Sequence, residues 1–332
     1  CASVTLGNTV QPSGNETSSC PLSSTISTFS IAGNLAIVSQ RISAASGENN
    51  PTFDLQSGSV TVGGTVAYTT AANGASIATL TMANGAQSGT LILSGSTPFT
   101  DSGNSGVETF AATGTGATVV YSGGAQTVRA VAYRNLTLSG SGSKTLTSVT
   151  SVSGNLVLSD SVTASNTSAL TVGGNLTLSG TAALTLGNTL TLTGNLEVGS
   201  GTTLTVPAET IAVTGTTSVS GTLTHTSTTG TKTYSGDVTI NNGGLFTETV
   251  NEAISFGGNV TISSGGTLTE NGTAAMTFAG NLQNNGTYTP STGAHTFSGA
   301  TKTFSGANTI SIPTVTVTGT YANNGTLAVA TL

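Results

Sequence analysis

Charged side chains are scarce in this sequence. Only 5% of the 332 residues are Asp, Glu, Lys or Arg, against about 25% in an ordinary globular domain. The net charge is −6 and the six basic residues are scattered along the chain, so no basic stretch is present to follow a nucleic-acid backbone. The composition therefore predicts no nucleic-acid partner, and it leaves Ser, Thr, Asn and Gly to cover the surface.

Long apolar runs are absent as well. No stretch reaches the roughly 18 apolar residues that a membrane-spanning helix needs, so we expect no membrane-spanning segment. Disorder is not expected either, because Val, Ile, Leu and Thr recur in alternating runs that disordered chains lack. The sequence opens at Cys1 and not at Met, which favours an exported product whose signal sequence has been removed, located outside the cell or on its surface.

Cysteine occurs only twice, at Cys1 and Cys20. Disulfides form in the oxidising environment that an exported chain enters, so one interpretation is a disulfide between Cys1 and Cys20. The second is a lipid-modified Cys1, because the opening "CAS" resembles the start of a mature bacterial lipoprotein. Intermolecular bridges and free thiols are the remaining interpretations.

A repeat of about twenty residues is the strongest pattern in the chain. "SVSGNLVLSD" at 151–160 is followed by "TVGGNLTLSG" at 171–180, and the steps between aligned glycines are 20, 20, 21, 21, 22, 22 and 19 residues. The aligned glycines are Gly154, Gly174, Gly194, Gly215, Gly236, Gly258, Gly280 and Gly299. This period is too short for an immunoglobulin-like sandwich or a propeller blade. It predicts an all-β parallel β-helix, or β-solenoid, with coils of about 20–22 residues.

Apolar positions within each copy alternate with polar ones, which places one row inside and the next in water. The row that contains Leu156, Leu176 and Leu196 is expected to stack coil upon coil at about 4.8 Å. A second row changes from aliphatic to aromatic along the chain; it comprises Val152, Val172, Leu192, Val213, Tyr234, Phe256, Phe278 and Phe297.

An Asn or Asp follows the repeat glycine, or takes the equivalent place, in most copies. Gly, Asn and Asp tolerate the tight turns that a coil needs, so we expect a ladder of turn side chains that hydrogen-bond along the axis. Its members are Asn135, Asn155, Asn175, Asn195, Asp237, Asn259 and Asn281.

The copies divide the chain unevenly. Residues 1–30 lack the repeat and carry both cysteines, so we expect a cap, a tether or a segment donated to another subunit. Residues 31–128 contain degenerate copies at wider spacing, and residues 129–332 are expected to form regular coils. The sequence stops at the apolar "NNGTLAVATL", which favours either a continuing chain or an open end that pairs with another subunit.

The units "GGNLTLSG" and "GNVTISSGGTL" resemble the repeats of bacterial secreted β-solenoid surface proteins, namely autotransporter passengers and filamentous-haemagglutinin-like adhesins. The resemblance covers residues 115–332 well and the first third poorly. It implies a right-handed β-helix, exported and displayed, that serves as an adhesin, stalk or fibre.

Groups that perform chemistry are few, and we assign no catalytic residue, no metal ligand and no cofactor. Glu248 and Glu252 are close in sequence, and we interpret them as solvated surface acids, with a carboxylate pair for glycoside hydrolysis or a calcium site as the alternative. His295 matches apolar wall positions of other coils, whereas His225 is expected to be exposed. A T-x-T ice-binding face is a further alternative, although its threonines are out of register between coils.

Several N-x-[ST] sequons fall in expected loops and are candidates for glycosylation. They are Asn166, Asn271, Asn285 and Asn324.

The function expected from the sequence is that of a structural subunit of an extracellular fibre or surface filament, assembled head to tail from copies of itself through open solenoid ends. One alternative is a monomeric adhesin or stalk, lipid-anchored at Cys1, that binds glycans or a host surface. A third is a polysaccharide-active β-helix enzyme.

Overall fold

The computed structural model describes residues 1–7, 27–39, 50–71, 76–83, 85–86, 88–207 and 209–332, and the backbone alone of 19–22. Within these residues the chain is all-β, without a helix, and the strands pair in parallel as a β-solenoid. The chain divides into two compact units, Cys1–Gly154 and Asn155–Leu332. The predicted fold class is confirmed, and the predicted right hand of the coil stays a prediction.

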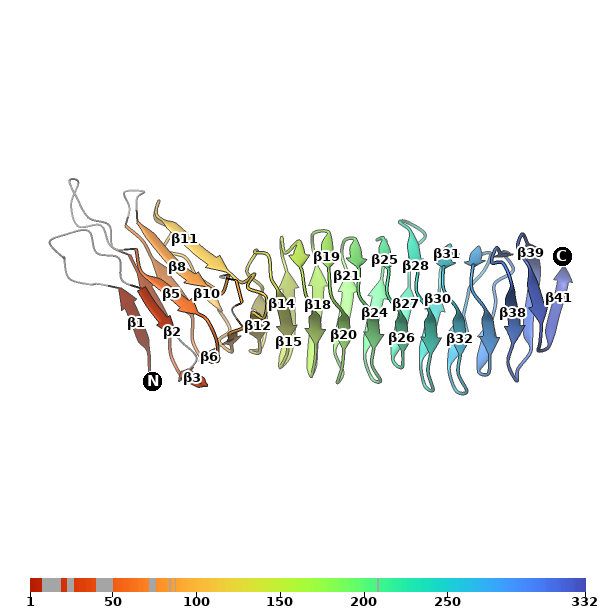
Figure 1. Cartoon of the computed structure of the whole chain (residues 1–332), viewed down its shortest axis with the longest axis horizontal. Helices are drawn as coiled ribbons and strands as arrows, with labels where there is room; N and C mark the ends of the chain where they lie inside the picture. Colours follow the sequence, from red (N-terminus) through yellow and green to blue (C-terminus); the bar gives the residue numbers. More distant parts are fainter. Residues whose placement is uncertain are drawn as a thin grey trace. The chain divides into compact units, whose positions relative to one another are not determined.

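The second unit consists of three parallel sheets, to which each coil up to Thr289 contributes one strand in turn, and the coils after it add strands to the first and third sheets. Figure 1 shows these strands following one another in chain order from green to blue. The first sheet contains β17 (Leu156–Leu158), β20 (Leu176–Leu178), β23 (Leu196–Val198), β26 (Thr217–Val219), β29 (Val238–Ile240), β32 (Val260–Ile262), β35 (Leu282–Asn284), β38 (Lys302–Ser305) and β40 (Tyr321–Asn323). The second contains β18 (Ser161–Asn166), β21 (Ala183–Leu186), β24 (Thr203–Val206), β27 (Thr222–His225), β30 (Leu245–Glu248), β33 (Thr267–Thr269) and β36 (Thr287–Thr289). The third contains β19 (Leu170–Val172), β22 (Leu190–Leu192), β25 (Ile211–Val213), β28 (Lys232–Tyr234), β31 (Ile254–Phe256), β34 (Met276–Phe278), β37 (Ala294–Phe297), β39 (Ile310–Val317) and β41 (Leu327–Thr331).

The register of the first sheet is the one that the repeat predicts. Leu156 pairs with Leu176, and Leu176 pairs with Leu196. All three side chains are at most 1% exposed. Alternate residues of each strand point inward, so the leucines of successive coils lie one above another and bury their surface without a second layer of structure. The predicted coil length and the predicted core row are confirmed.

Aromatic rings form a continuous stack in the third sheet. Tyr234, Phe256, Phe278 and Phe297 pair in register, with ring centroids 6.0, 5.2 and 5.0 Å apart and interplanar angles of 24°, 23° and 11°. Such offset stacking adds to the stabilisation from burial alone, by roughly 0.5–1.5 kcal/mol for each pair. The shift from aliphatic to aromatic residues in this row therefore produces a packed aromatic column.

The first unit has wider coils. Phe29 pairs with Val60 and Val60 with Leu91, two steps of 31 residues, and Leu91 pairs with Val119, a step of 28. The longer connections between strands account for the degenerate repeat in this part of the chain. Residues 4–7 already pair as a strand with residues 35–38, and the domain boundaries expected at residues 30 and 128 stay a prediction.

The strands of this unit fall into several parallel sheets. One contains β1 (Val4–Gly7), β4 (Leu35–Val38), β7 (Val66–Thr69) and β10 (Phe99–Thr100), and another contains β2 (Ser19–Leu22), β5 (Thr52–Leu55), β8 (Ile77–Thr81) and β11 (Val107–Ala111). A third contains β3 (Thr28–Ile31), β6 (Ser59–Val62), β9 (Thr90–Leu93), β12 (Thr118–Tyr121) and β14 (Asn135–Leu138). The remaining strands are β13 (Gln126–Thr127), which pairs with β15 (Ser141–Leu146), and β16 (Ser151–Val152).

Candidate functional site

The interior of the second unit contains ionisable side chains, of which only His295 was expected to lie in the wall of the coil. They lie in the coils between residues 222 and 297, and each is at most 4% exposed. The set is His225, Lys232, Glu248, Glu252, Glu270 and His295. Buried charges and polar groups are costly unless they are paired, so the partners of each residue decide what these groups do.

His225 and Tyr234 form the first buried pair. The Tyr234 hydroxyl lies 2.9 Å from Nε2 of His225, and Nδ1 faces the Thr247 carbonyl oxygen at 3.4 Å. A carbonyl only accepts, so Nδ1 carries the proton and Nε2 accepts from the tyrosine. Burial lowers the pKa of His225 to about 3 and raises the pKa of Tyr234 far above its ordinary value. Both side chains are therefore neutral at physiological pH. They fill the interior of the coil as a hydrogen-bonded pair.

Lys232 and Glu252 form the second pair, at one corner of the coil. Lys232 takes a place in an apolar column, between Ile211 and Ile254. Its Nζ donates to the Thr229 carbonyl oxygen at 2.7 Å and lies 3.6 Å from Oε2 of Glu252. That oxygen has no hydrogen-bond partner among the described residues.

Glu248 lies near this pair and is satisfied by the backbone. Its Oε1 accepts from the backbone N–H of Val250, and its Oε2 accepts from that of Asn271 at 2.9 Å. Its role is that of a turn-forming residue, because it ties the end of β30 to the segment that follows β33 in the next coil.

Glu270 is the centre of the third cluster. Its Oε2 lies 2.6 Å from Nε2 of His295 and accepts from the backbone N–H of Ser291 at 3.0 Å, while its Oε1 accepts from the Tyr288 hydroxyl at 2.8 Å. The other ring nitrogen of His295 faces the Gly293 carbonyl oxygen at 2.9 Å. Every polar atom of the glutamate is thus engaged by groups of the protein itself.

Three expectations for these residues were wrong and one is confirmed. His225, Glu248 and Glu252 are buried and not solvated. Each extends or flanks an inward-alternating strand, and for His225 this signal was readable from its position two residues after Leu223. His295 is buried and pairs with Met276, as its alignment with apolar wall positions predicted.

The turn ladder is built from side-chain oxygens and backbone N–H groups. Oδ1 of Asn155 accepts from the backbone N–H of Asn175 at 2.9 Å, and Asn175 accepts from Asn195 in the same way at 2.9 Å. The same bond is made by Asn195 to Thr216, Asp237 to Asn259, Asn259 to Asn281 and Asn281 to Thr303, at 2.7–2.9 Å. Because Asp237 serves as well as asparagine, the acceptor oxygen is the functional atom. In the first unit, Oδ1 of Asn34 accepts from Thr65 at 2.9 Å in the same manner, and Asn135 donates from Nδ2 to the Ala117 carbonyl at 3.1 Å.

The candidate glycosylation sites differ in exposure. Asn271 and Asn324 are exposed, and Asn285 is half-buried and accepts a bond from the backbone of Ala307. Asn166 is the last residue of β18, is fully buried, and donates from Nδ2 to the carbonyls of Ser168 and Asn188. The loop position expected for Asn166 is wrong, because its amide caps an inward row. Attachment of a glycan at the other three stays a prediction.

The structure does not test the expectations for the two cysteines. Cys1 is exposed, and its amino group donates to the Ser30 carbonyl at 2.9 Å. The side chain of Cys20 lies outside the described residues, so both the disulfide and the lipid modification stay predictions.

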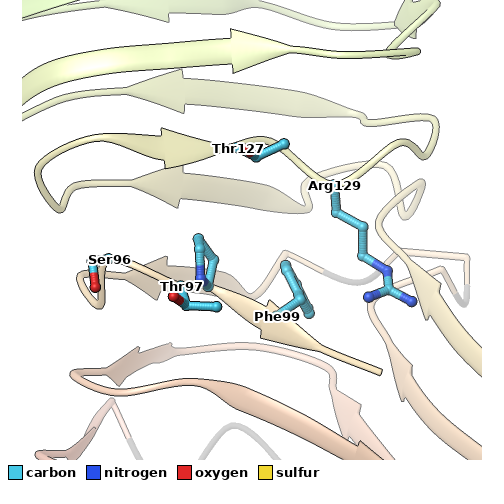
Figure 2. Close-up of a pocket in the computed structure, with 6 residues that line it drawn as sticks. Ser96, Thr97, Phe99, Thr127 and Arg129 are labelled. Atoms are coloured by element: carbon cyan, nitrogen blue, oxygen red, sulfur yellow. The ribbon is translucent and has the colours of Figure 1, made fainter. Parts of the chain in front are cut away.

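The surface of the first unit contains a hollow beside β10. Its lining residues are Ser96, Thr97, Pro98, Phe99, Thr127 and Arg129. Figure 2 shows Phe99 and Arg129 extending side by side on one flank of it. The Arg129 guanidinium stacks 5.0 Å from the Phe99 ring and 5.2 Å from the Tyr68 ring, and it pairs with Asp101 at 2.7 Å. The arrangement offers an aromatic edge, hydroxyls and a charged pair to a small polar ligand.

Two features are absent from the part of the chain that the structure describes. No cluster of three or more His, Cys, Asp or Glu residues suited to a metal ion occurs there. Nor does that part contain a helix long and apolar enough to cross a membrane. Comparison of the chain with protein-family models, curated proteins and solved structures found no match.

Proposed function

We propose that this chain is a structural subunit of an extracellular fibre or surface filament. The observation that supports the proposal is the uniform register of the second unit, in which successive coils offer apolar rows and acceptor oxygens of the turn ladder to the next, with one interruption at Thr216 and Thr217. Such a stack is held by contacts between neighbouring coils alone, so a contact between two copies can reproduce the contact within one chain.

Head-to-tail contacts of this heterologous kind do not close and therefore produce open filaments. The buried ionisable groups fit this function, because most of their polar atoms are engaged by neighbouring coils and serve cohesion. The ladder and the aromatic column lie along the axis, which is the direction in which a fibre bears load.

Negative-stain electron microscopy of the purified chain tests assembly. We expect filaments whose amount rises with protein concentration, and sonicated filaments should shorten the lag of fresh material. The matched variant is Cys1→Ser, which should assemble equally well. Particles of a single short length over a wide range of concentration would contradict the proposal, and filaments lost in Cys1→Ser would show that a cysteine joins the copies.

A second candidate function is that of an adhesin that binds glycans, favoured by the hollow at Phe99 and Arg129. Aromatic faces combined with hydroxyl and charged hydrogen-bonding groups suit sugar ligands. A glycan array probed with the chain and with Phe99→Ala tests it, since binding at this hollow predicts a signal lost in the variant. Intact mass spectrometry supplies a separate test of a lipid anchor, because acylation adds the mass of fatty acyl chains to Cys1.

A further inference from the structure

The buried corner at Lys232 and Glu252 is poorly explained as an ion pair. Both side chains are at most 3% exposed, and taking two opposite charges out of water is repaid only by close, hydrogen-bonded geometry. The separation of 3.6 Å between Nζ and Oε2 exceeds hydrogen-bond distance, and Oε2 has no other partner among the described residues. The two groups are therefore adjacent and dry, and one oxygen of the carboxylate is left unsatisfied.

The environment favours the uncharged form of each group. Desolvation by burial is the main cause that lowers the pKa of the Lys232 ammonium, and the same cause raises the pKa of the Glu252 carboxyl. The Glu248 carboxylate acts in the same direction on Glu252. A neutral amine is a nucleophile and a protonated carboxyl has a hydroxyl that can leave as water, so burial raises the fraction of each group that is in the form needed for condensation, against the mutual attraction of the two charged forms.

We propose that Lys232 and Glu252 condense to an isopeptide bond that joins β28 covalently to the segment before β31 in the next coil. The Nζ lone pair attacks Cδ of Glu252 and forms the C–N bond. The C–O bond to the carboxyl hydroxyl breaks, and a proton from Nζ leaves with that oxygen as water. No oxidant, reductant or other reactant takes part.

The surroundings hold the two reactants in place. The Thr229 carbonyl accepts from Nζ at 2.7 Å and orients it. Lys232 is fixed at its backbone by parallel pairing with Ile211 and Ile254, and Ile254 lies two residues after Glu252. Holding reacting groups in contact replaces an encounter in solution by a unimolecular step. The product replaces two buried ionisable groups and an unpaired oxygen by one neutral amide.

The cross-link is a device of cohesion between coils and goes beyond the proposed assembly into fibres. It closes a ring between positions 232 and 252, and cross-links of this kind restrict the unfolded chain. Its presence or absence is independent of whether copies of the chain polymerise, so the two proposals fail separately.

Intact mass spectrometry of the denatured full-length chain decides the matter. We expect a mass lower by one water molecule than the sequence requires, and peptide mapping should find the peptides of Lys232 and Glu252 joined. A disulfide removes two hydrogens and is distinguished by that difference. The mass of the wild-type chain does not depend on whether any variant folds.

The variants Lys232→Met and Glu252→Ala should both have the full mass expected from their sequences. The matched control is Lys144→Met, because Lys144 is equally buried but donates to the backbone carbonyls of Gly123, Gly124 and Ser141; it should retain the deficit. A wild-type chain at full mass after prolonged incubation at neutral pH, or a deficit that persists in Lys232→Met or maps elsewhere, overturns the proposal.

Discussion

Glu270 and His295 lie 2.6 Å apart with both side chains fully buried, although 25 residues separate them in the sequence. The Gly293 carbonyl oxygen and the Glu270 carboxyl oxygen face the two nitrogens of the imidazole, so the ring is held on both sides by buried hydrogen bonds. The pair joins two sheets at a corner of the coil, which makes it a point where the fold is sensitive to a single change.

Glu270→Gln should destabilise the chain strongly. The substitution keeps the shape but removes the carboxyl oxygen that faces Nε2 of His295 in a fully buried pair, and breaking a buried pair in this way costs about 3–5 kcal/mol. Urea unfolding followed by circular dichroism measures the loss. The control is Glu197→Gln on the exposed face of β23, which should change the free energy of unfolding by no more than about 0.5 kcal/mol. Equal effects of the two substitutions would contradict the assignment.

Leu176→Ala should destabilise the stack by about 2–5 kcal/mol, because it leaves a cavity between two leucines in register. The neighbouring Thr177→Ala changes a residue of the same strand that points outward and is half-buried. It should have a much smaller effect on the free energy of unfolding. Unfolding of both variants in guanidinium chloride measures the two losses of unfolding free energy. A larger loss for Thr177→Ala would mean that Thr177, and not Leu176, points inward.

Asn175→Ala removes one acceptor oxygen of the turn ladder. The backbone N–H of Asn195 then loses its partner, and we expect a loss of about 1 kcal/mol. Asn175→Asp keeps the acceptor, as Asp237 does naturally, and should retain most of the stability. Thermal unfolding of the two variants separates the contribution of the acceptor oxygen from that of the amide nitrogen. If the ladder depended on stacked amides, Asn175→Ala and Asn175→Asp would lose equal stability.

Stability should fall in acid because of His225. Its pKa is about 3 when folded and about 6.5 when unfolded, so the unfolded chain binds a proton that the folded chain does not. The contribution is complete above pH 6.5 and is lost as pH falls from 6.5 toward 3, by at most about 1.4 kcal/mol per pH unit for one proton.

His225→Phe removes this proton and keeps an aromatic ring beside Phe246, whose ring centroid lies 5.2 Å from that of His225 at an interplanar angle of 34°. The slope of unfolding free energy against pH should therefore be smaller in the variant over pH 4–6. The difference between the two curves isolates His225 from the carboxylates, which titrate in both proteins. Parallel curves would mean that His225 is accessible to protons in the folded chain.

The coils could be predicted from the sequence because the repeat has the length of one coil. Leu156, Leu176 and Leu196 recur at the spacing of one turn, and a one-residue slip would turn each of them outward. The ladder was also predictable, although its bonds run from side-chain oxygens to backbone N–H groups. The burial of Asn166 and His225 was missed although both continue the alternation of their strands at the last position, because a polar residue next to a run of polar residues was interpreted as part of a turn.

The sequence by itself determined the period of the solenoid, the rows that fill it and the turn positions, since each of these is a relation between residues one coil apart. Only the tertiary structure decided which buried groups meet. Lys232 with Glu252 and Glu270 with His295 come from different segments of successive coils, and no spacing rule links them. They are brought together because closing a coil at its corners sets the distances between sheets, and in the dry interior each ionisable group needs a polar partner.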